Sequence, residues 1–248
     1  MRTLVAIPVY NEERYVARVV SSVLEYADDV LVIDDGSTDR TPALLAGLPV
    51  HVIRHSGNQG YGRSLIDAFA YAAGRGYDWV VTMDCDEQHE PARLPGFFAA
   101  QAVGGADILS GSRYIATMDA QTTPPADRRA INVAMTAEIN ERLGFDPALT
   151  DTFCGFKSHR VSALSKLALT EGGYAFPMQF WPQVAAARLR VVEVPVKLIY
   201  KDLTRTFGGL LDDPAARLKH YRCVLHREIQ RLEGRLPRSA RVLLSACD

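Results

Sequence analysis

Short hydrophobic runs alternate with helical patterns through the first half of the chain. Runs rich in β-branched residues predict strands at residues 4–9, 30–33, 50–53, 79–83 and 107–110. Between the first two runs, apolar residues recur at helical spacing, at Val16, Val19, Val20, Val23 and Leu24. Strands that alternate with helices in this way form βαβ units. The pattern therefore predicts an α/β fold in which a mostly parallel, Rossmann-like sheet is flanked by helices.

The second half of the chain is less regular. Residues 115–127 form a polar stretch with prolines, which suits either a mobile loop over an active site or a passive connection. A helix is expected near residues 130–143, further helix near 184–187 and a strand at 191–199.

An amphipathic helix is predicted near the C-terminus, at residues 215–232. Its apolar stripe consists of Leu218, Tyr221, Leu225, Ile229 and Leu232, and basic side chains lie elsewhere on its surface. Such a helix either packs its stripe on the core or lies on a membrane surface. We therefore expect one domain over residues 1–210, followed by a helical extension and tail over residues 211–248.

Composition and charge narrow the range of functions. The chain has 248 residues and a formal net charge of −1, so no global charge attracts it to nucleic acid. Its four cysteines are far apart, without the spacing of a zinc site or a disulfide framework, which fits a reducing cytoplasm. No apolar stretch reaches the ~18 residues that span a bilayer, and no signal peptide is evident. We expect a cytoplasmic protein whose membrane contact, if it has one, is peripheral at the inner face; no pattern indicates an oligomeric state.

Carboxylate pairs follow two of the predicted strands, at residues 34–35 and at residues 84–86. In open α/β sheets, ligands bind outside the carboxyl ends of the strands, so both pairs can face one crevice. Asp84 and Asp86 offer hard oxygen ligands for Mg²⁺ or Mn²⁺, and Gln88 offers a third. A bound cation would act as a Lewis acid on a departing diphosphate. The alternative is a turn whose acids cap the next helix.

Asp35 precedes the turn formed by residues 36–39. A carboxylate in this place could accept N–H bonds from a nucleobase edge, where uracil offers one donor and guanine two. It could also shape the loop as an Asx-turn. Asp35 is therefore a candidate for base recognition or for loop structure.

Motifs that occur in one order over residues 3–200 carry a family resemblance. They are Ile7-Pro8-Val9-Tyr10-Asn11-Glu12, Val32-Ile33-Asp34-Asp35-Gly36-Ser37-Thr38-Asp39, Asn58-Gln59-Gly60-Tyr61-Gly62, Met83-Asp84-Cys85-Asp86-Glu87-Gln88-His89, Gly111-Ser112-Arg113-Tyr114 and Asp151-Thr152-Phe153-Cys154-Gly155-Phe156-Lys157. Together they resemble the family-two inverting glycosyltransferases, in particular the dolichol-phosphate mannosyltransferase-like branch. The resemblance implies a GT-A fold with a nucleotide-binding half at about residues 1–114 and an acceptor half at about residues 115–210.

The resemblance also implies roles for residues of the donor site. The residues implied to line the nucleoside pocket are Pro8, Tyr10, Glu12, Ile33 and Asp35. Asp84, Cys85 and Asp86 would meet the ribose, the diphosphate and the metal. Within this set, Asp86, assisted by Gln88, would be the direct metal ligand, and Asp84 and the Cys85 backbone would face the nucleotide.

Basic residues are implied on the leaving-group side of the site. Arg113 would approach the donor diphosphate or sugar, because its guanidinium is planar and permanently charged. The alternative is a surface arginine paired with an acid. The branch also carries a basic pair that closes over the diphosphate, for which Lys201 and Arg205 are the candidates. Their spacing is tighter than the family pattern, and Arg205 is the preferred member. Gly60 and Gly62 are interpreted as the turn that opens a helix.

The role of Asp151 depends on the acceptor. If the acceptor is an alcohol, a carboxylate must take its proton, and Asp151 is the candidate base. A phosphate acceptor, with a second pKa of about 6, is already anionic and needs no base, so Asp151 would then help to place the acceptor or the loop. Arg113 and Arg205 would stabilise the leaving group in either case. A structural alternative makes Asp151 the N-cap of a helix containing His159 and Val161.

The resemblance therefore implies transfer of a hexose from a nucleoside-diphosphate sugar, of the GDP-mannose or UDP-glucose type, to polyprenyl phosphate. One alternative is transfer to a hydroxyl of a soluble glycan or small metabolite. Another is a non-catalytic module that binds nucleotide sugars. A nucleotidyltransferase or a dinucleotide-dependent oxidoreductase would carry a glycine-rich loop after the first strand, where this chain has residues 8–12 in its place.

Overall fold

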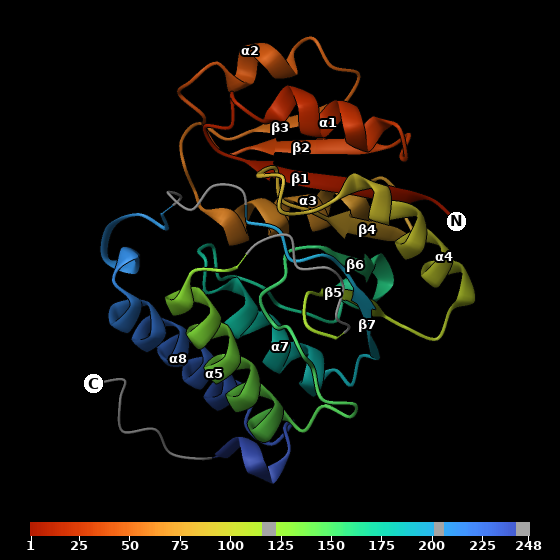
Figure 1. Ribbon diagram of the computed structural model, residues 1–248. Helices are drawn as coiled ribbons and strands as arrows, with labels where there is room; N and C mark the ends of the chain where they lie inside the picture. Colours follow the sequence, from red (N-terminus) through yellow and green to blue (C-terminus); the bar gives the residue numbers. More distant parts are fainter. Residues whose placement is uncertain (116–122, 201–205, 242–248) are drawn as a thin grey trace.

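One mixed sheet forms the centre of the molecule. The computed structural model describes residues 1–115, 123–200 and 206–241. The sheet has seven strands in the order β3-β2-β1-β4-β6-β5-β7 (Figure 1). The strands are β1 (Thr3–Val9), β2 (Val30–Asp34), β3 (His51–Arg54), β4 (Trp79–Thr82), β5 (Ile108–Ser112), β6 (Lys157–Arg160) and β7 (Val191–Pro195). Neighbouring strands are parallel, except that β6 runs antiparallel to both β4 and β5. The prediction of a mostly parallel sheet is confirmed.

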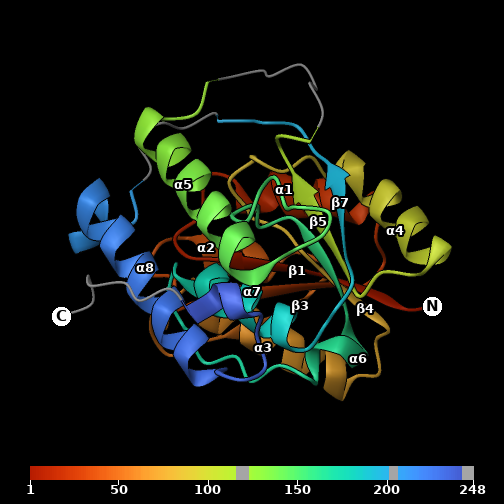
Figure 2. The same cartoon turned by 90° about the horizontal axis from the view of Figure 1, so that it is seen from below.

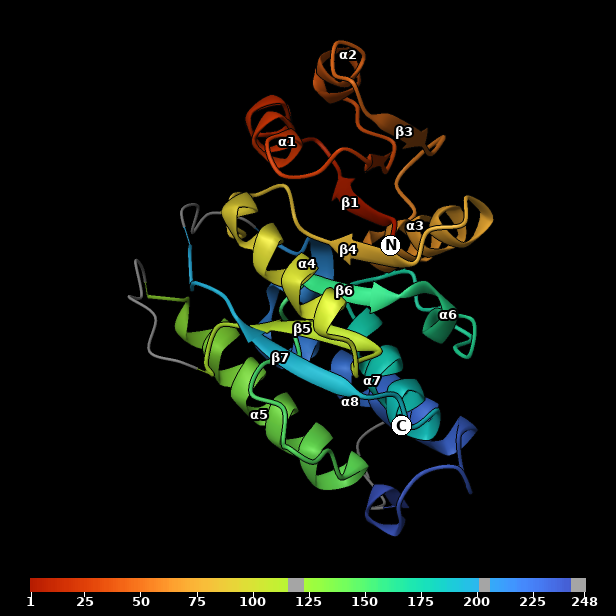
Figure 3. The same cartoon turned by 90° about the vertical axis from the view of Figure 1, so that its right-hand side faces the viewer.

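Helices cover both faces of this sheet. They are α1 (Val16–Leu24), α2 (Thr41–Leu45), α3 (Tyr61–Gly74), α4 (Leu94–Val103), α5 (Ala126–Leu143), α6 (Val161–Leu164), α7 (Phe176–Ala186) and α8 (Pro214–Arg231), with short 3-10 turns η1 (Pro91–Arg93), η2 (Gly209–Asp212) and η3 (Arg238–Arg241). Side chains of α1, α2 and α4 join one hydrophobic core, and those of α3, α5, α7 and α8 join the other. The view in Figure 3 separates α1 and α4 from α7 and α8 across the sheet.

The alternation of side chains along β2 shows how the two cores arise. Leu31 and Ile33 point into the core beneath α3, whereas Val30 and Val32 point into the core beneath α1. All four are at most 1% exposed. A strand that is buried on both faces has a nearly continuous run of apolar residues, and the sequence of β2 shows this pattern.

Strand β6 corrects a prediction made from the sequence. A helix was expected around His159, but the chain is extended until α6 begins at Val161. The interpretation of Asp151 as the N-cap of that helix is therefore wrong, because a strand separates the two. Strand β6 carries polar side chains that the sheet nevertheless buries. The Ser158 hydroxyl accepts a 2.8 Å hydrogen bond from the Gln101 amide.

His159 makes the stability of this fold sensitive to acid. Its ring is 2% exposed and packs between Phe69 and Phe180. Burial, with a further contribution from the charge of Lys157, lowers its pKa from 6.5 to about 3. Below pH 6.5 the unfolded chain therefore binds a proton that the folded chain does not, until the pH approaches 3. The free energy of unfolding should fall as the pH drops through this window and should be fully retained above it.

We expect His159→Phe to remove about 2 kcal/mol of the stability difference between about pH 7.5 and about pH 5. Urea unfolding of both proteins at the two pH values measures this difference. The exposed His51, changed to Leu, is the control and should leave the acid sensitivity intact. Equal acid sensitivity in the wild type and His159→Phe would contradict the assignment.

The C-terminal helix belongs to the core. Helix α8 packs against α7 and α5, and Figure 2 shows α5 and α8 on the same side of the molecule. The stripe of Tyr221, Leu225 and Ile229 is at most 5% exposed. Core packing is thus confirmed for this stripe, and the alternative that it lies on a membrane is wrong. In the part of the chain that the structure describes, no helix is long and apolar enough to cross a bilayer.

Other predicted elements are confirmed with shifted ends. Helix α5 begins before the expected residue 130, and the helix near residues 184–187 is the end of the longer α7. The strand expected at residues 191–199 is shorter as β7. Most of the polar stretch at residues 115–127, interpreted as either a loop over the active site or a passive connection, lies outside the described residues, which resume at residue 123.

Candidate active site

One cavity of about 820 Å³ lies at the carboxyl ends of β1, β2 and β4. The residues assigned to the site from the sequence that line this cavity are Pro8, Tyr10, Glu12, Asp35, Asp84, Cys85, Asp86, Gln88 and Arg113. They come from segments far apart in the sequence that the parallel strands bring to one edge of the sheet. Asp151 lies behind Arg113 and is not part of the lining. Lys201 and Arg205 lie outside the described residues.

Ile33 does not line the cavity, which corrects the expected nucleoside pocket. Its side chain is fully buried and belongs to the core beneath α3. The reason is position along the strand: Ile33 lies within β2 and packs against the core beneath α3, whereas Asp35 lies beyond the end of the strand. Asp35 therefore reaches the cavity and Ile33 packs below it.

The two carboxylates after β2 have different partners. Asp34 Oδ1 accepts the Ser37 N–H at 2.9 Å, and Arg54 Nε lies 3.1 Å from Asp34 Oδ2. Asp34 thus makes the turn that was one interpretation of Asp35. Asp35 instead accepts backbone N–H groups of the loop before α3, from Gln59 to Oδ1 and from Gly60 to Oδ2, both at 2.8 Å.

The glycines of this loop are structural, as expected. Gly60 has a φ of 102°, and a Cβ there would lie 2.3 Å from the carbonyl oxygen of Gly172. A Cβ at Gly62 would lie 2.2 Å from the carbonyl oxygen of Glu171. Any larger residue would push the start of α3 away from this neighbouring loop.

The acidic centre after β4 is held by hydrogen bonds from three sides. Tyr61 donates its hydroxyl to Asp84 Oδ1 at 3.0 Å, and Asp86 Oδ1 accepts the Gln88 N–H at 3.1 Å. Burial, and next the charge of Asp84, raise the pKa of Tyr61 well above its usual value, so its hydroxyl keeps its proton. The backbone N–H of Asp84 donates to His89 Nδ1 at 2.9 Å.

His89 and Tyr61 were not assigned from the sequence, although both stand inside motifs. Burial lowers the pKa of His89 to about 4, so its ring is neutral near pH 7. Because Nδ1 accepts a hydrogen bond, the ring proton is on Nε2, which lies 3.7 Å from Asp84 Oδ2 and 4.0 Å from Cys154 Sγ. A histidine that follows two carboxylates so closely was the available signal.

The residues of this centre fit a divalent cation. Asp84 and Asp86 are half-buried and line the cavity together with Gln88. A Cβ on Gly155 would lie 2.6 Å from Asp84 Oδ2, so only glycine leaves the space beside this carboxylate open. Within the described residues, no group of three His, Cys, Asp or Glu side chains forms a complete cage. Mg²⁺ commonly uses one or two carboxylates and completes its shell with water and substrate phosphates.

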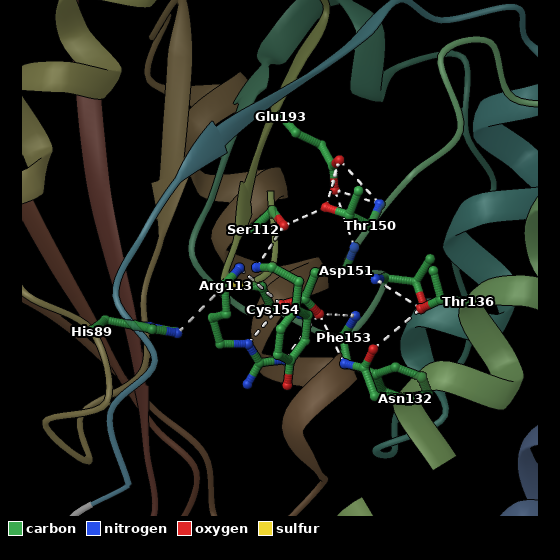
Figure 4. Close-up of polar contacts among 12 residues, drawn as sticks. His89, Ser112, Arg113, Asn132, Thr136, Thr150, Asp151, Phe153, Cys154 and Glu193 are labelled. Atoms are coloured by element: carbon green, nitrogen blue, oxygen red, sulfur yellow. Dashed lines mark hydrogen bonds and ion pairs between the residues drawn. The ribbon is translucent and has the colours of Figure 1, made fainter. Parts of the chain in front are cut away.

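Arg113 follows β5 and makes a buried, two-pronged ion pair with Asp151 (Figure 4). Its Nε lies 2.6 Å from Asp151 Oδ2, and its Nη2 lies 2.9 Å from Oδ1. The Arg113 side chain is 11% exposed, and Asp151 is not exposed at all. The alternative interpretation of Arg113, a surface arginine paired with an acid, is thus right about the acid and wrong about the surface.

The surroundings of Asp151 favour a positioning role over a basic one. Its Oδ1 also accepts the Asn132 amide at 2.9 Å and the N–H groups of Phe153 and Cys154 at 3.2 Å. Burial alone would raise the pKa of Asp151, but the charge and hydrogen bonds of Arg113 lower it to about 2. A general base works best with a pKa near the operating pH. Asp151 has neither that pKa nor contact with the cavity.

A second carboxylate fixes the loop that carries Asp151. Glu193 on β7 accepts the N–H of Thr150 at 3.0 Å, the Thr150 hydroxyl at 2.8 Å and the N–H of Asp151 at 3.1 Å (Figure 4). The Thr150 hydroxyl also lies 2.5 Å from that of Ser112 on β5. The edge strand β7 therefore sets the position of Asp151, and through it the guanidinium of Arg113.

The far side of the cavity combines arginines with aromatic rings. Arg128 of α5 and Arg217 of α8 lie 5.0 and 4.4 Å from the ring centroid of Phe207. Tyr174 packs edge-on against the same ring at 5.3 Å. All of these residues line the cavity together with Tyr221. Arg217 is also paired with Asp127, so Arg128 is the arginine that can meet an anion next to an apolar chain here. The sequence did not reveal this part because its residues come from separate helices and loops.

Known proteins share both the sequence and the fold. The sequence model described as Glycosyl transferase family 2 matches residues 4–167. The chain is 30% identical over 233 residues to an undecaprenyl-phosphate mannosyltransferase of Micrococcus luteus, covering 89% of this chain and 94% of that protein. It is 32% identical over 213 residues to a polyprenol monophosphomannose synthase of Mycolicibacterium smegmatis, covering 82% of this chain and 79% of that protein.

A solved structure with the same fold has a metal and a nucleotide bound. Glucosyl-3-phosphoglycerate synthase of Mycobacterium tuberculosis, in complex with Mn²⁺, UDP and glucosyl-3-phosphoglycerate, superimposes with a TM-score of 0.70. The identity is 18%, and the match covers 92% of this chain and 79% of that one, so it shows the GT-A fold. With the family match over residues 4–167 and the 30% identity to the Micrococcus luteus protein, the chain belongs to glycosyl transferase family 2.

Proposed function

We propose that this enzyme moves a hexose from a nucleoside-diphosphate sugar to polyprenyl phosphate with inversion at the sugar, and that it needs Mg²⁺ or Mn²⁺. The observation that carries the proposal is that one cavity joins the carboxylates of Asp84 and Asp86 to the arginines and rings around Phe207. The relatives named as polyprenyl-phosphate mannosyltransferases support this acceptor. A lipid-borne acceptor also supports a place of action at the inner face of the membrane.

The donor would occupy the half of the molecule formed by residues 1–114. Pro8, Tyr10, Glu12 and Asp35 line its nucleoside end. Asp86, Asp84 and Gln88 would hold the cation, which supplies Lewis-acid stabilisation of the departing diphosphate. Lys201 and Arg205 are proposed to close over the same diphosphate. The positive charges of the cation and of these two basic residues would favour departure of the nucleoside diphosphate with the bonding electrons.

The acceptor would enter from the half formed by residues 115–210. A phosphate oxygen attacks the anomeric carbon opposite the diphosphate, so the enzyme must hold both groups in line. The acceptor phosphate is already anionic and needs no base. We therefore replace the basic role of Asp151 with that of a residue that orients Arg113. Arg128 is placed to bind the acceptor phosphate, and Phe207 and Tyr221 to contact its prenyl chain. Arg217 is 3% exposed and paired with Asp127, so it supports the Phe207 ring.

A comparison of matched acceptors tests this proposal. A short prenyl phosphate and the corresponding prenol are offered with GDP-mannose or UDP-glucose and with Mg²⁺ or Mn²⁺. We expect transfer to the phosphate and at least about a hundredfold less to the prenol, because a neutral hydroxyl finds no base at the site. Faster transfer to the prenol or to a soluble sugar would favour the hydroxyl alternative. Binding of a nucleotide sugar without turnover, for any acceptor, would favour a binding module.

Two neighbouring arginines of α5 offer a matched pair for the acceptor side. Arg128 lines the cavity, whereas Arg129 stacks on Tyr114 at 3.7 Å and is not part of the lining. In the same assay, Arg128→Ala should raise the KM for the prenyl phosphate about tenfold or more, the loss of one charge-assisted contact. Arg129→Ala should leave it near the wild-type value. Equal effects of both would contradict the assignment of Arg128.

A further inference from the structure

A chain of hydrogen-bonded side chains stands behind Asp35 and has no part in the proposed chemistry. His55, which follows β3, places Nδ1 2.7 Å from Asp35 Oδ1 and Nε2 3.0 Å from Asp67 Oδ2. Asp67 on α3 is in turn held by Arg63, whose Nε and Nη2 donate to its two oxygens at 2.8 and 2.6 Å. The His55 side chain is 6% exposed, while that of Arg63 is 48% exposed. The chain therefore links the surface to the floor of the nucleoside end.

The histidine ring is oriented from both sides. Ionised carboxylates only accept hydrogen bonds, so both contacts of His55 are satisfied when both ring nitrogens carry hydrogen. Asp35 fixes one edge of the ring and Asp67 the other. Rotation of the ring would lose two charge-assisted hydrogen bonds at once.

Among the residues that the structure describes, these contacts leave Asp35 with one free acceptor position. A carboxylate has about four lone-pair positions. Oδ1 is filled by Gln59 N–H and His55 Nδ1, and Oδ2 receives the Gly60 N–H. The remaining position is on Oδ2 of a residue that lines the cavity. It can take a single N–H, such as the one uracil presents or one of the two from guanine.

We propose that His55, Asp67 and Arg63 are positioning residues, which hold the Asp35 carboxylate in the orientation that leaves one acceptor for a nucleobase N–H. This inference rests on the proposed function, because it assumes that a nucleoside binds at Asp35. In a free aspartate, the χ2 torsion that turns the carboxylate varies over a broad range. Three donors from two segments, the loop before α3 and the end of β3, remove that freedom.

The test separates the nucleoside from the diphosphate. His55→Leu should raise the KM for the sugar donor and the Kd for its nucleoside diphosphate about tenfold or more, with kcat changed much less. Inhibition by pyrophosphate with Mn²⁺ should stay near the wild-type value, because pyrophosphate has no base. His55→Asn keeps a donor near the position of Nδ1 and should restore part of the binding. Asp67→Asn, which keeps the shape of the chain, should give a smaller loss in the same direction.

The control is His51→Leu, at the exposed start of the same strand, which should bind like the wild type. An equal loss of pyrophosphate and nucleotide binding in both His55→Asn and Asp67→Asn would show general damage and overturn the positioning role. Unchanged nucleotide binding in these variants would overturn it as well. If the wild type binds no nucleoside diphosphate, it is the proposed function that fails, and this outcome is read from the wild type alone.

Discussion

Asp86→Asn should lower kcat about a thousandfold, whatever nucleotide sugar proves to be the donor. The amide can still accept the Gln88 N–H that shapes the loop, but the charge that attracts a divalent cation is gone. Lewis-acid stabilisation of a leaving group is worth several kcal/mol, and about 4 kcal/mol corresponds to a thousandfold. The fold should be unaffected, because Asp86 is half-buried at the cavity and outside the core.

Thermal unfolding with UDP or GDP, with and without Mn²⁺, gives a second measurement of the same change. The wild type should be stabilised by one diphosphate in a metal-dependent way, and Asp86→Asn should lose this coupling. Glu90→Gln is the matched control, because it removes one negative charge from the same segment while Glu90 is paired with Lys197 at 2.8 Å. A metal response in Asp86→Asn equal to that of the wild type would contradict the metal assignment.

Variants of the ion pair between Arg113 and Asp151 should affect folding stability and transfer activity differently. In Arg113→Met the fully buried Asp151 loses its cation, and breaking such a pair costs about 3–5 kcal/mol of folding free energy. In the double variant Arg113→Met/Asp151→Asn neither charge of this pair remains, so most of this stability should return. Transfer should stay at least about a hundredfold below wild type in both, because the guanidinium at the cavity is absent.

Urea unfolding and the transfer assay on the four proteins of this cycle measure both effects. Asp151→Asn alone should lose activity through a misplaced Arg113. If the double variant regained activity, Arg113 would not act on the substrate. If it regained no stability, the two residues would not be coupled.

The sequence predicted those parts of the fold that depend on local patterns. The apolar runs identified β1 to β5 and β7. Strands β1, β2, β4 and β5 are buried on both faces and need such residues, whereas the edge strands β3 and β7 are partly exposed. Strand β6 was missed because Lys157, Ser158 and His159 are polar, and their burial depends on partners from other elements. Helix α7 was only partly predicted, because Pro177 and Pro182 interrupt its pattern.

In the candidate site too, the residues that depend on local patterns were predictable and those that depend on tertiary packing were not. The acids after β2 and β4 were predictable, since residues after parallel strands meet at one edge. The pairing of Arg113 with Asp151 was not, because it joins residues far apart in sequence through the antiparallel placement of β6. Arg128 and Arg217 come from α5 and α8, and only their packing brings them to one ring. For Asp151, the sequence identified the residue and missed the partner that changes its chemistry.

The reversed direction of β6 has a consequence for how this enzyme can diversify. In a fully parallel sheet, only segments that leave strands reach the ligand edge. Here the segment that leads into β6, which contains Asp151 and Gly155, arrives at that edge as well, beside Asp84. Changes in length or sequence before residue 151 can therefore alter acceptor recognition while the donor loops after β1, β2 and β4 stay as they are. Because of this one inverted strand, the binding sites for the two substrates can evolve on separate segments of the chain.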